Sequence, residues 1–130
     1  MKSRENMLRL KHFQVEDRTR QLTQIELMIG ELTRMADELG QQIKIEETRT
    51  GISDPNHFAY PTFAKAARQR RANLEGSIRD LGVKREAAAE ALAGAEEDLK
   101  KAMLVEQRDG NAPVSEGAID ARTEARAMIG

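Results

Sequence analysis

The sequence predicts an all-α protein, a long antiparallel two-helix coiled-coil hairpin followed by a mobile C-terminal tail. The first observation is composition: charged residues make up 33% of the 130 residues, and aromatic residues only 3%. Such a balance is typical of long exposed helices and excludes a large compact core. The hydrophobic share of 39% with a net charge of -1 also excludes full disorder.

The second observation is a heptad that we expect to form a helix over about residues 3–49. Apolar side chains recur every seven residues at Leu8, Val15, Leu22, Ile29, Ala36 and Ile43. The companion positions of the same seam are Lys11, Arg18, Ile25, Leu32, Leu39 and Glu46. Six uninterrupted heptads favour a coiled coil over an ordinary globular helix. Gly51 should end the helix, because glycine readily adopts a left-handed conformation there.

The third observation is a break in this pattern, which predicts a turn over about residues 50–61. It contains Pro55 and Pro61, two of the three prolines of the chain. Proline cannot continue a helix interior and pushes the residue before it away from helical geometry. Pro61 suits the first turn of a new helix.

A second helix is expected over about residues 61–108, with its own seam. One set of seam positions is Tyr60, Ala67, Leu74, Leu81, Ala88, Ala95 and Ala102. The other set is Ala64, Arg71, Ile78, Arg85, Leu92, Leu99 and Glu106. If facing residue numbers sum to 110, large residues of the first helix face alanines, as with Ile43 and Ala67. A sum of 117, which pairs Glu46 with Arg71, stays open, although the first register centres the turn on Pro55.

Residues 109–130 are predicted to form a flexible or weakly helical tail beyond a hairpin domain of residues 1–108. The segment from Asp109 to Pro113 contains Gly110 and a proline, which is a strong helix-breaking combination. The residues that follow lack a convincing apolar stripe, as is common at chain termini.

Several functions are excluded or not expected. The chain has no cysteine, so it has no disulfide and no thiolate chemistry. His12 and His57 lie far apart, and no catalytic, metal-binding or phosphate-loop motif occurs, so we expect no enzyme activity and no cofactor. No run approaches the roughly 18 apolar residues of a membrane span. The residues after Met1 include no apolar signal segment, so we expect a cytoplasmic protein.

The turn gathers most of the aromatic residues. Phe58, Tyr60 and Phe63 lie within six residues beside His57, and the chain has only four aromatic residues. One interpretation is that they cap the open end of the coiled coil. The other is a recognition tip, because exposed aromatic side chains make good interface anchors.

A basic window follows the turn over residues 65–85. It contains seven basic residues and only two acidic ones, Glu75 and Asp80. It can be a solvated helix face with intrahelical ion pairs, or a docking face for an acidic partner. Nucleic acid is a weaker third option, because no aromatic residues alternate with the arginines. The candidate partner-binding residues are Lys65, Arg68, Arg70, Arg71, Arg79, His57, Phe58 and Tyr60.

Four segments resemble bacterial flagellar export proteins of the FliJ family. They are the opening residues from Met1 to Phe13, the turn from Asp54 to Thr62, the stretch from Ala64 to Leu74, and the stretch from Asp98 to Ala102. The similarity covers roughly residues 1–108. The break at Gly110 and Pro113 departs from the family, whose members continue as charged helix.

The resemblance implies a non-enzymatic adaptor of the flagellar type III export apparatus, cytoplasmic and peripheral to the inner membrane at the flagellar base. The implied partners are the hexameric export ATPase, the export-gate membrane protein and substrate chaperones. No family binding residue can be matched to this chain. Two alternatives remain: a structural coiled coil that self-associates through the alanines of residues 87–95, and a nucleic-acid-binding hairpin that uses residues 65–85.

Overall fold

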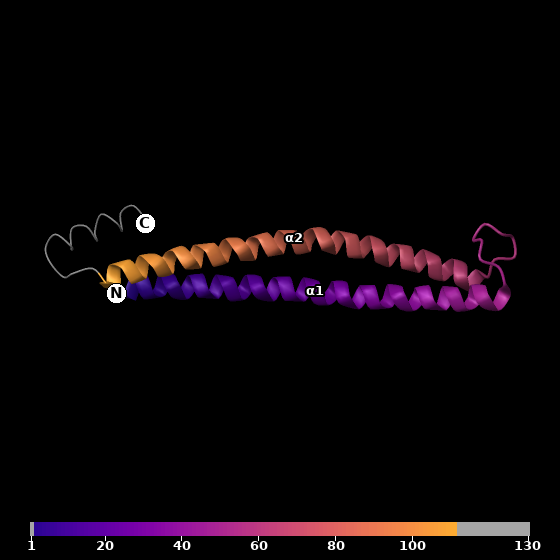
Figure 1. Cartoon of the computed structure of the whole chain (residues 1–130), viewed down its shortest axis with the longest axis horizontal. Coiled ribbons are helices and arrows are strands. Elements are labelled where there is room, and N and C mark those ends of the chain that lie inside the picture. Colours follow the sequence, from indigo (N-terminus) through magenta and orange to yellow (C-terminus); the bar gives the residue numbers. More distant parts are fainter. Residues whose placement is uncertain (1, 112–130) are drawn as a thin grey trace. The chain divides into compact units, whose positions relative to one another are not determined.

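The computed structural model describes residues 2–111, and this part of the chain is two long helices packed against each other, without a strand. Helix α1 covers Lys2–Thr50 and helix α2 covers Thr62–Asn111 (Figure 1). The predicted all-α helical hairpin is therefore confirmed. Contacts divide the described residues into two units: residues 19–91, which include the turn, and residues 2–18 with 92–111.

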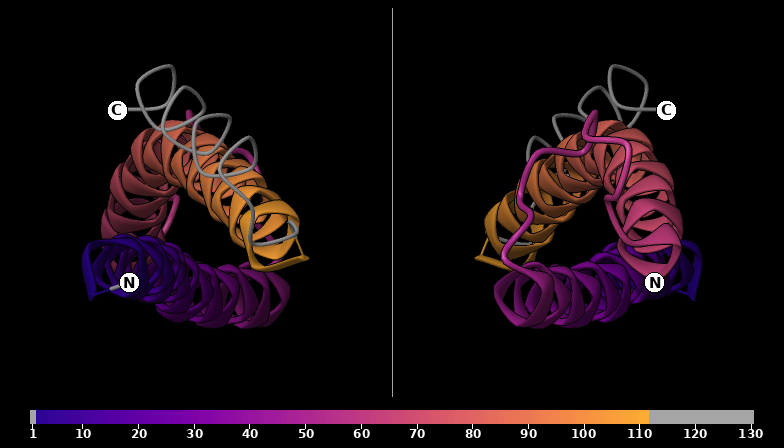
Figure 2. Two further views of the ribbon diagram at one scale, coloured as in Figure 1. Left: turned by 90° about the vertical axis from the view of Figure 1, so that its left-hand side faces the viewer. Right: turned by 90° about the vertical axis from the view of Figure 1, so that its right-hand side faces the viewer.

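The ends of the helices at the turn follow from local backbone chemistry. Gly51 has a positive φ of 76°, and its N–H donates a hydrogen bond of 2.8 Å to the Glu47 carbonyl. This is the left-handed C-terminal cap that the sequence predicted. The chain then loops out and returns to start α2, whose first hydrogen bond runs from the Lys65 N–H to the Pro61 carbonyl (Figure 2). Pro61 therefore comes directly before the helix, which begins at Thr62.

The predicted seam is the shielded face of both helices. Almost every predicted seam position along α1 and α2 is half-buried or buried. The exceptions are three arginines, Arg18, Arg71 and Arg85. Arginine at a seam position can keep its charged head in water while its stem packs on apolar neighbours.

The unit of residues 19–91 contains every buried hydrophobic side chain of the described residues. They come from the end of α1 and the start of α2: Ala36, Leu39, Ile43, Tyr60, Ala64 and Ala67. Leu39, Ile43 and Ala67 form one cluster, against which the half-buried Leu74 packs. The core is thus concentrated near the turn.

Contacts across the seam fall in the register centred on the turn. In one unit, a methyl group at Gly40 would lie 3.3 Å from Cζ of Arg71, and these numbers sum to 111. In the other, Arg4 pairs with Glu106, and these numbers sum to 110. The alternative register would shift one helix by about 10 Å and pair Arg71 across the seam. Arg71 instead pairs with Glu75 on its own helix.

Within the unit of residues 2–18 and 92–111, ion pairs connect α1 to α2. Arg4 Nε lies 3.3 Å from Glu106 Oε2, and Arg4 Nη2 lies 3.1 Å from Asp109 Oδ2. The Asp109 side chain is only 7% exposed, and Asp109 is the buried charged residue of the described chain.

This contact corrects the expected end of the second helix. The second helix was expected to end at about residue 108, and α2 continues three residues further, through Asp109 and Gly110 to Asn111. A carboxylate close to a helix C-terminus is unfavourable with the helix dipole, and the ion pair with Arg4 offsets this repulsion. Residues 112–130 of the predicted tail lie outside the described residues.

Candidate interaction site

The turn between the helices is held by hydrogen bonds within residues 54–60. The Asp54 carboxylate accepts the Asn56 N–H at 2.9 Å, and the Asp54 carbonyl accepts the His57 N–H at 3.0 Å. His57 contributes twice more: its Nδ1 accepts the Ala59 N–H at 3.0 Å, and its carbonyl accepts the Tyr60 N–H at 3.0 Å. These bonds fix the turn by its own side chains.

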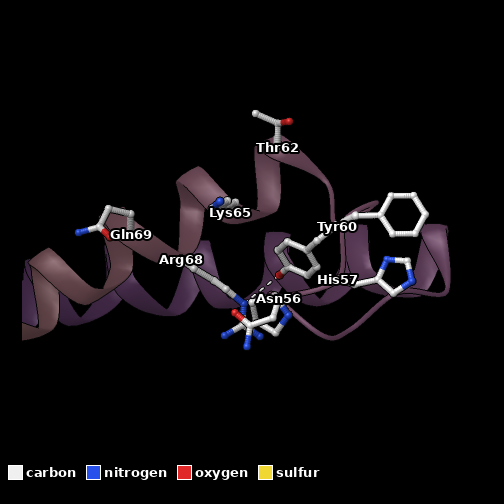
Figure 3. Close-up of a pocket in the computed structure, with 9 residues that line it drawn as sticks. Asn56, His57, Tyr60, Thr62, Lys65, Arg68 and Gln69 are labelled. Carbon is white, nitrogen blue, oxygen red and sulfur yellow. Dashed lines mark hydrogen bonds between the residues drawn. The ribbon is translucent and has the colours of Figure 1, made fainter.

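Tyr60 connects the turn to both helices. Its hydroxyl donates to Glu47 Oε2 at 2.7 Å. It also accepts from Arg68 Nε at 2.8 Å, the bond drawn in Figure 3. Arg68 Nη2 also lies 3.0 Å from the same Glu47 oxygen, and Arg68 Cζ lies 5.8 Å from the centre of the Tyr60 ring. The three side chains therefore combine an ion pair, two hydrogen bonds to the hydroxyl and a cation–π contact.

These contacts set the ionisation of the cluster formed by Glu47, Tyr60 and Arg68. The pKa of Glu47 is lowered, chiefly by the hydrogen bond from Tyr60 and then by that from Arg68. The pKa of Tyr60 is raised, first by burial and then by its hydrogen bond to Glu47. At neutral pH the cluster therefore holds a carboxylate, a neutral phenol and a guanidinium.

The aromatic residues of the turn separate into two roles. Tyr60 is only 8% exposed and caps the end of the hairpin core, as one of the two interpretations predicted for the aromatic group. Phe58 is 96% exposed, and its ring stacks on the His57 ring with centroids 4.7 Å apart and planes inclined by 22°. Phe63, on the first turn of α2, is 56% exposed. Phe58 thus takes no part in the core.

A polar hollow of about 600 Å³ lies beside the turn, within the unit of residues 19–91. Figure 3 shows the turn residues on one side and side chains of α2 on the other. The lining residues are Pro55, Asn56, His57, Phe58, Tyr60, Thr62, Lys65, Arg68 and Gln69. Five of the predicted partner-binding residues are therefore brought together: His57, Phe58, Tyr60, Lys65 and Arg68.

The basic window of residues 65–85 is only partly neutralised. Three of its arginines have carboxylate partners: Arg68 with Glu47, Arg71 with Glu75 at 3.4 Å, and Arg85 with Glu86 at 3.8 Å. No ion pair with another described residue occurs for the other four cations, which are exposed: Lys65, Arg70, Arg79 and Lys84. The structure places Lys65 beside the turn, and Arg70, Arg71 and Arg79 further along α2.

Glu47 was missed by the sequence analysis. It is the carboxylate that both Tyr60 and Arg68 contact, and its side chain is only 16% exposed. A signal was present in the sequence. In the register centred on the turn, Glu47 and Arg68 both lie next to the seam, where opposite charges on facing helices pair.

Comparison of the chain with protein-family models, with curated proteins and with solved structures found no match. Within residues 2–111, no helix is sufficiently long and apolar to cross a membrane. The same residues contain no group of histidine and carboxylate side chains arranged to hold a metal ion. Among the described residues, the site presents an exposed ring, a polar hollow and cations without an ion-pair partner.

Proposed function

We propose that this chain is a non-enzymatic adaptor of the flagellar type III export apparatus that docks on the hexameric export ATPase and the export-gate membrane protein. Escort of substrate chaperones belongs to the same proposal, with a location at the flagellar base. The likeness to the FliJ family over roughly residues 1–108 supports it. The helical hairpin also supports it, because two exposed helices offer extended charged surfaces for partners.

The observation that carries the proposal is a set of exposed cations on α2 that make no ion pair within residues 2–111. An intramolecular ion pair already satisfies Arg68, whereas Arg70 and Arg79 are exposed and lack such a partner among the described residues. Exposed positive charges that have no ion-pair partner attract an acidic partner and orient it as it binds. Their exposure on the solvent face of α2 allows them to contact a partner without a change in the fold.

The test is binding of the purified full chain to the purified export ATPase and to the cytosolic domain of the export-gate protein. We expect the double variant Arg70→Glu and Arg79→Glu to bind the ATPase about tenfold or more weakly, because opposed charges become like charges. The matched control reverses two exposed cations of the same helix outside the window, Lys100→Glu and Lys101→Glu. It should bind as the unmodified chain does.

The outcomes separate the parts of the proposal. Unchanged binding by the double variant removes the basic window from the docking surface. If the unmodified chain binds neither the ATPase nor the gate domain at low salt, the assignment to the export apparatus fails.

Self-association is a second candidate, and a specific observation favours it. No large side chain of the described residues is fully buried, and apolar side chains remain about half exposed on α1 at Met7, Leu10 and Phe13. A two-helix core is thin, and a second copy would cover such residues. Sedimentation at micromolar concentration tests this candidate, which a strict monomer contradicts.

A further inference from the structure

Phe58 stands apart from the other aromatic side chains of the chain. It is 96% exposed, whereas Phe13 and Phe63 are each 56% exposed and Tyr60 is 8% exposed. A fully solvated phenyl ring forgoes about 2 kcal/mol or more of hydrophobic stabilisation that burial would return. None of the described residues 2–111 buries the ring, so its burial is left to a partner molecule.

The position of the Phe58 ring is also fixed by its neighbours in the turn. The ring stacks on His57, and the His57 imidazole in turn accepts the Ala59 N–H. The turn is fixed further by the bonds of Asp54 and by the Tyr60 hydroxyl on Glu47. Binding through a fixed loop loses little conformational entropy, so more of the contact energy appears as affinity.

The charges beside Phe58 favour an acidic surface. The Glu47 carboxylate is paired with Arg68, and the Asp54 carboxylate, which keeps its charge while it accepts a backbone N–H, does not line the hollow. Lys65 lines the hollow with Phe58 and makes no ion pair with a described residue. No carboxylate is among the residues that line the hollow, so Lys65 is the cation without an ion-pair partner that shares the hollow with the exposed ring.

From these observations we infer that the turn is a docking tip: Phe58 enters an apolar socket on a protein, and carboxylates at the socket's rim pair with Lys65. The inference rests on the proposed function, because the socket is expected on a component of the export apparatus. A protein fits better than a lipid surface. At the turn, one exposed ring and one lysine without an ion-pair partner match a socket that accepts a single side chain. Stable membrane binding needs a larger apolar face or a cluster of cations at the same place.

The experiment measures binding of the purified full chain to the export ATPase and, separately, to the cytosolic domain of the export-gate protein. Phe58→Ser and Lys65→Glu should each weaken binding to one of these two proteins by about tenfold or more, as for a central interface anchor. Added salt should weaken the unmodified chain more than the Lys65→Glu variant. Phe58→Ser should leave the thermal unfolding midpoint unchanged, because the ring is outside the core.

Two matched controls use residues of the same types that do not line the hollow. Phe63→Ser removes another exposed phenylalanine, and Lys100→Glu reverses another exposed lysine. Both should keep binding within about twofold of the unmodified chain, because interface energy is concentrated in a few residues. An equal loss with Phe63→Ser would mean non-specific apolar contact and would overturn the docking tip.

The failures of the two proposals are distinguishable. If the unmodified chain binds one of the two proteins and Phe58→Ser binds equally well, the docking tip is wrong while the adaptor assignment stands. If the unmodified chain binds neither, both fall. Sedimentation of the chain with phosphatidylglycerol vesicles is the third arm, and association that disappears in Phe58→Ser would assign the ring to a membrane and overturn the protein socket.

Discussion

Both units of the hairpin carry the same heptad pattern, but within each unit a different force holds the two helices together. In residues 19–91, Leu39 and Ile43 are buried with small residues at the start of α2. In residues 2–18 with 92–111, no hydrophobic side chain is buried, and Arg4 bridges to Glu106 and Asp109 instead. A heptad thus specifies which face is shared, whereas side-chain size and charge decide how firmly that face is closed.

This difference has consequences for stability. Burial of apolar area responds weakly to salt, whereas exposed ion pairs are screened and contribute little. The ion pairs of Arg4 are partly shielded, with the side chain 18% exposed. Neither Arg4 Nη2 nor Glu106 Oε2 makes a hydrogen bond of good geometry, although both lie in ion-pair contact. The unit that contains the turn should therefore be the more stable one.

The largest effect is expected from Ile43→Ala. Ile43 is buried in the cluster with Leu39 and Ala67, so the substitution should lower the free energy of unfolding by about 3 kcal/mol. The matched control is Leu92→Ala, a half-buried seam residue of the other unit, which should cost less. Urea unfolding followed by far-ultraviolet circular dichroism measures both. An equal loss in the two variants would contradict a core concentrated near the turn.

The next effect tests the charged closure of the other unit. Asp109→Ala leaves Arg4 without its second carboxylate, and we expect a local loss of about 1–3 kcal/mol. Hydrogen exchange should become faster in residues 2–18 and 92–108 and stay unchanged near the turn. Asp98→Ala removes an exposed carboxylate of the same helix and should have no such effect. Faster exchange confined to the turn would refute the role of Asp109.

A smaller effect is expected at the C-terminal cap of α1. Gly51→Ala places a side chain at a φ of 76°, which should cost about 1 kcal/mol. Gly30→Ala is the control, because the glycine lies inside α1 and a methyl group there would meet nothing within 4 Å. That change should stabilise the helix by up to about 1 kcal/mol. Thermal unfolding measures whether each variant is more or less stable than the unmodified chain. A more stable Gly51→Ala variant would contradict the role of Gly51 as the C-terminal cap of α1.

The sequence predicted the features that depend on local chemistry and periodicity. The heptad identified the seam, Gly51 identified the end of α1, and the prolines identified the turn. The sequence did not predict the pairing of Arg4 with Asp109 near the end of α2, because the two residues lie more than a hundred residues apart in the chain. The helix propensity of a few residues is a weak influence that one tertiary contact can outweigh.

The candidate site was predictable in composition but not in geometry. The sequence placed Phe58 and Tyr60 in one aromatic group with two roles left open. The backbone of the turn separates them, with Tyr60 buried against Glu47 and Phe58 pointing into solvent. The heptad of the second helix had placed Tyr60 at a seam position, which agrees with its burial. Phe58 lies outside both heptads, so the sequence pattern did not indicate where its ring points.

The smallest expected effect is a pH response confined to the turn. The folded state lowers the pKa of Glu47 below its ordinary value of 4.5, so the carboxylate stabilises the folded turn fully above pH 4.5. This contribution is lost as the pH falls through the lowered pKa. Tyr60 has the opposite sign: its pKa is raised above 10.0, so its contribution is complete below pH 10.0 and is lost as the pH rises through the raised value.

The fluorescence of Tyr60 measures this response, because it is the one tyrosine of a chain without tryptophan. In Glu47→Gln, the acid-induced change should disappear while the alkaline change remains, since only the phenol then titrates. Glu97→Gln, which removes an exposed carboxylate far from the turn in sequence, should keep both changes. An acid transition that persists in Glu47→Gln would mean that another group controls the turn. The hydrogen bond between Tyr60 and Glu47 would then not be what fixes the turn that exposes Phe58.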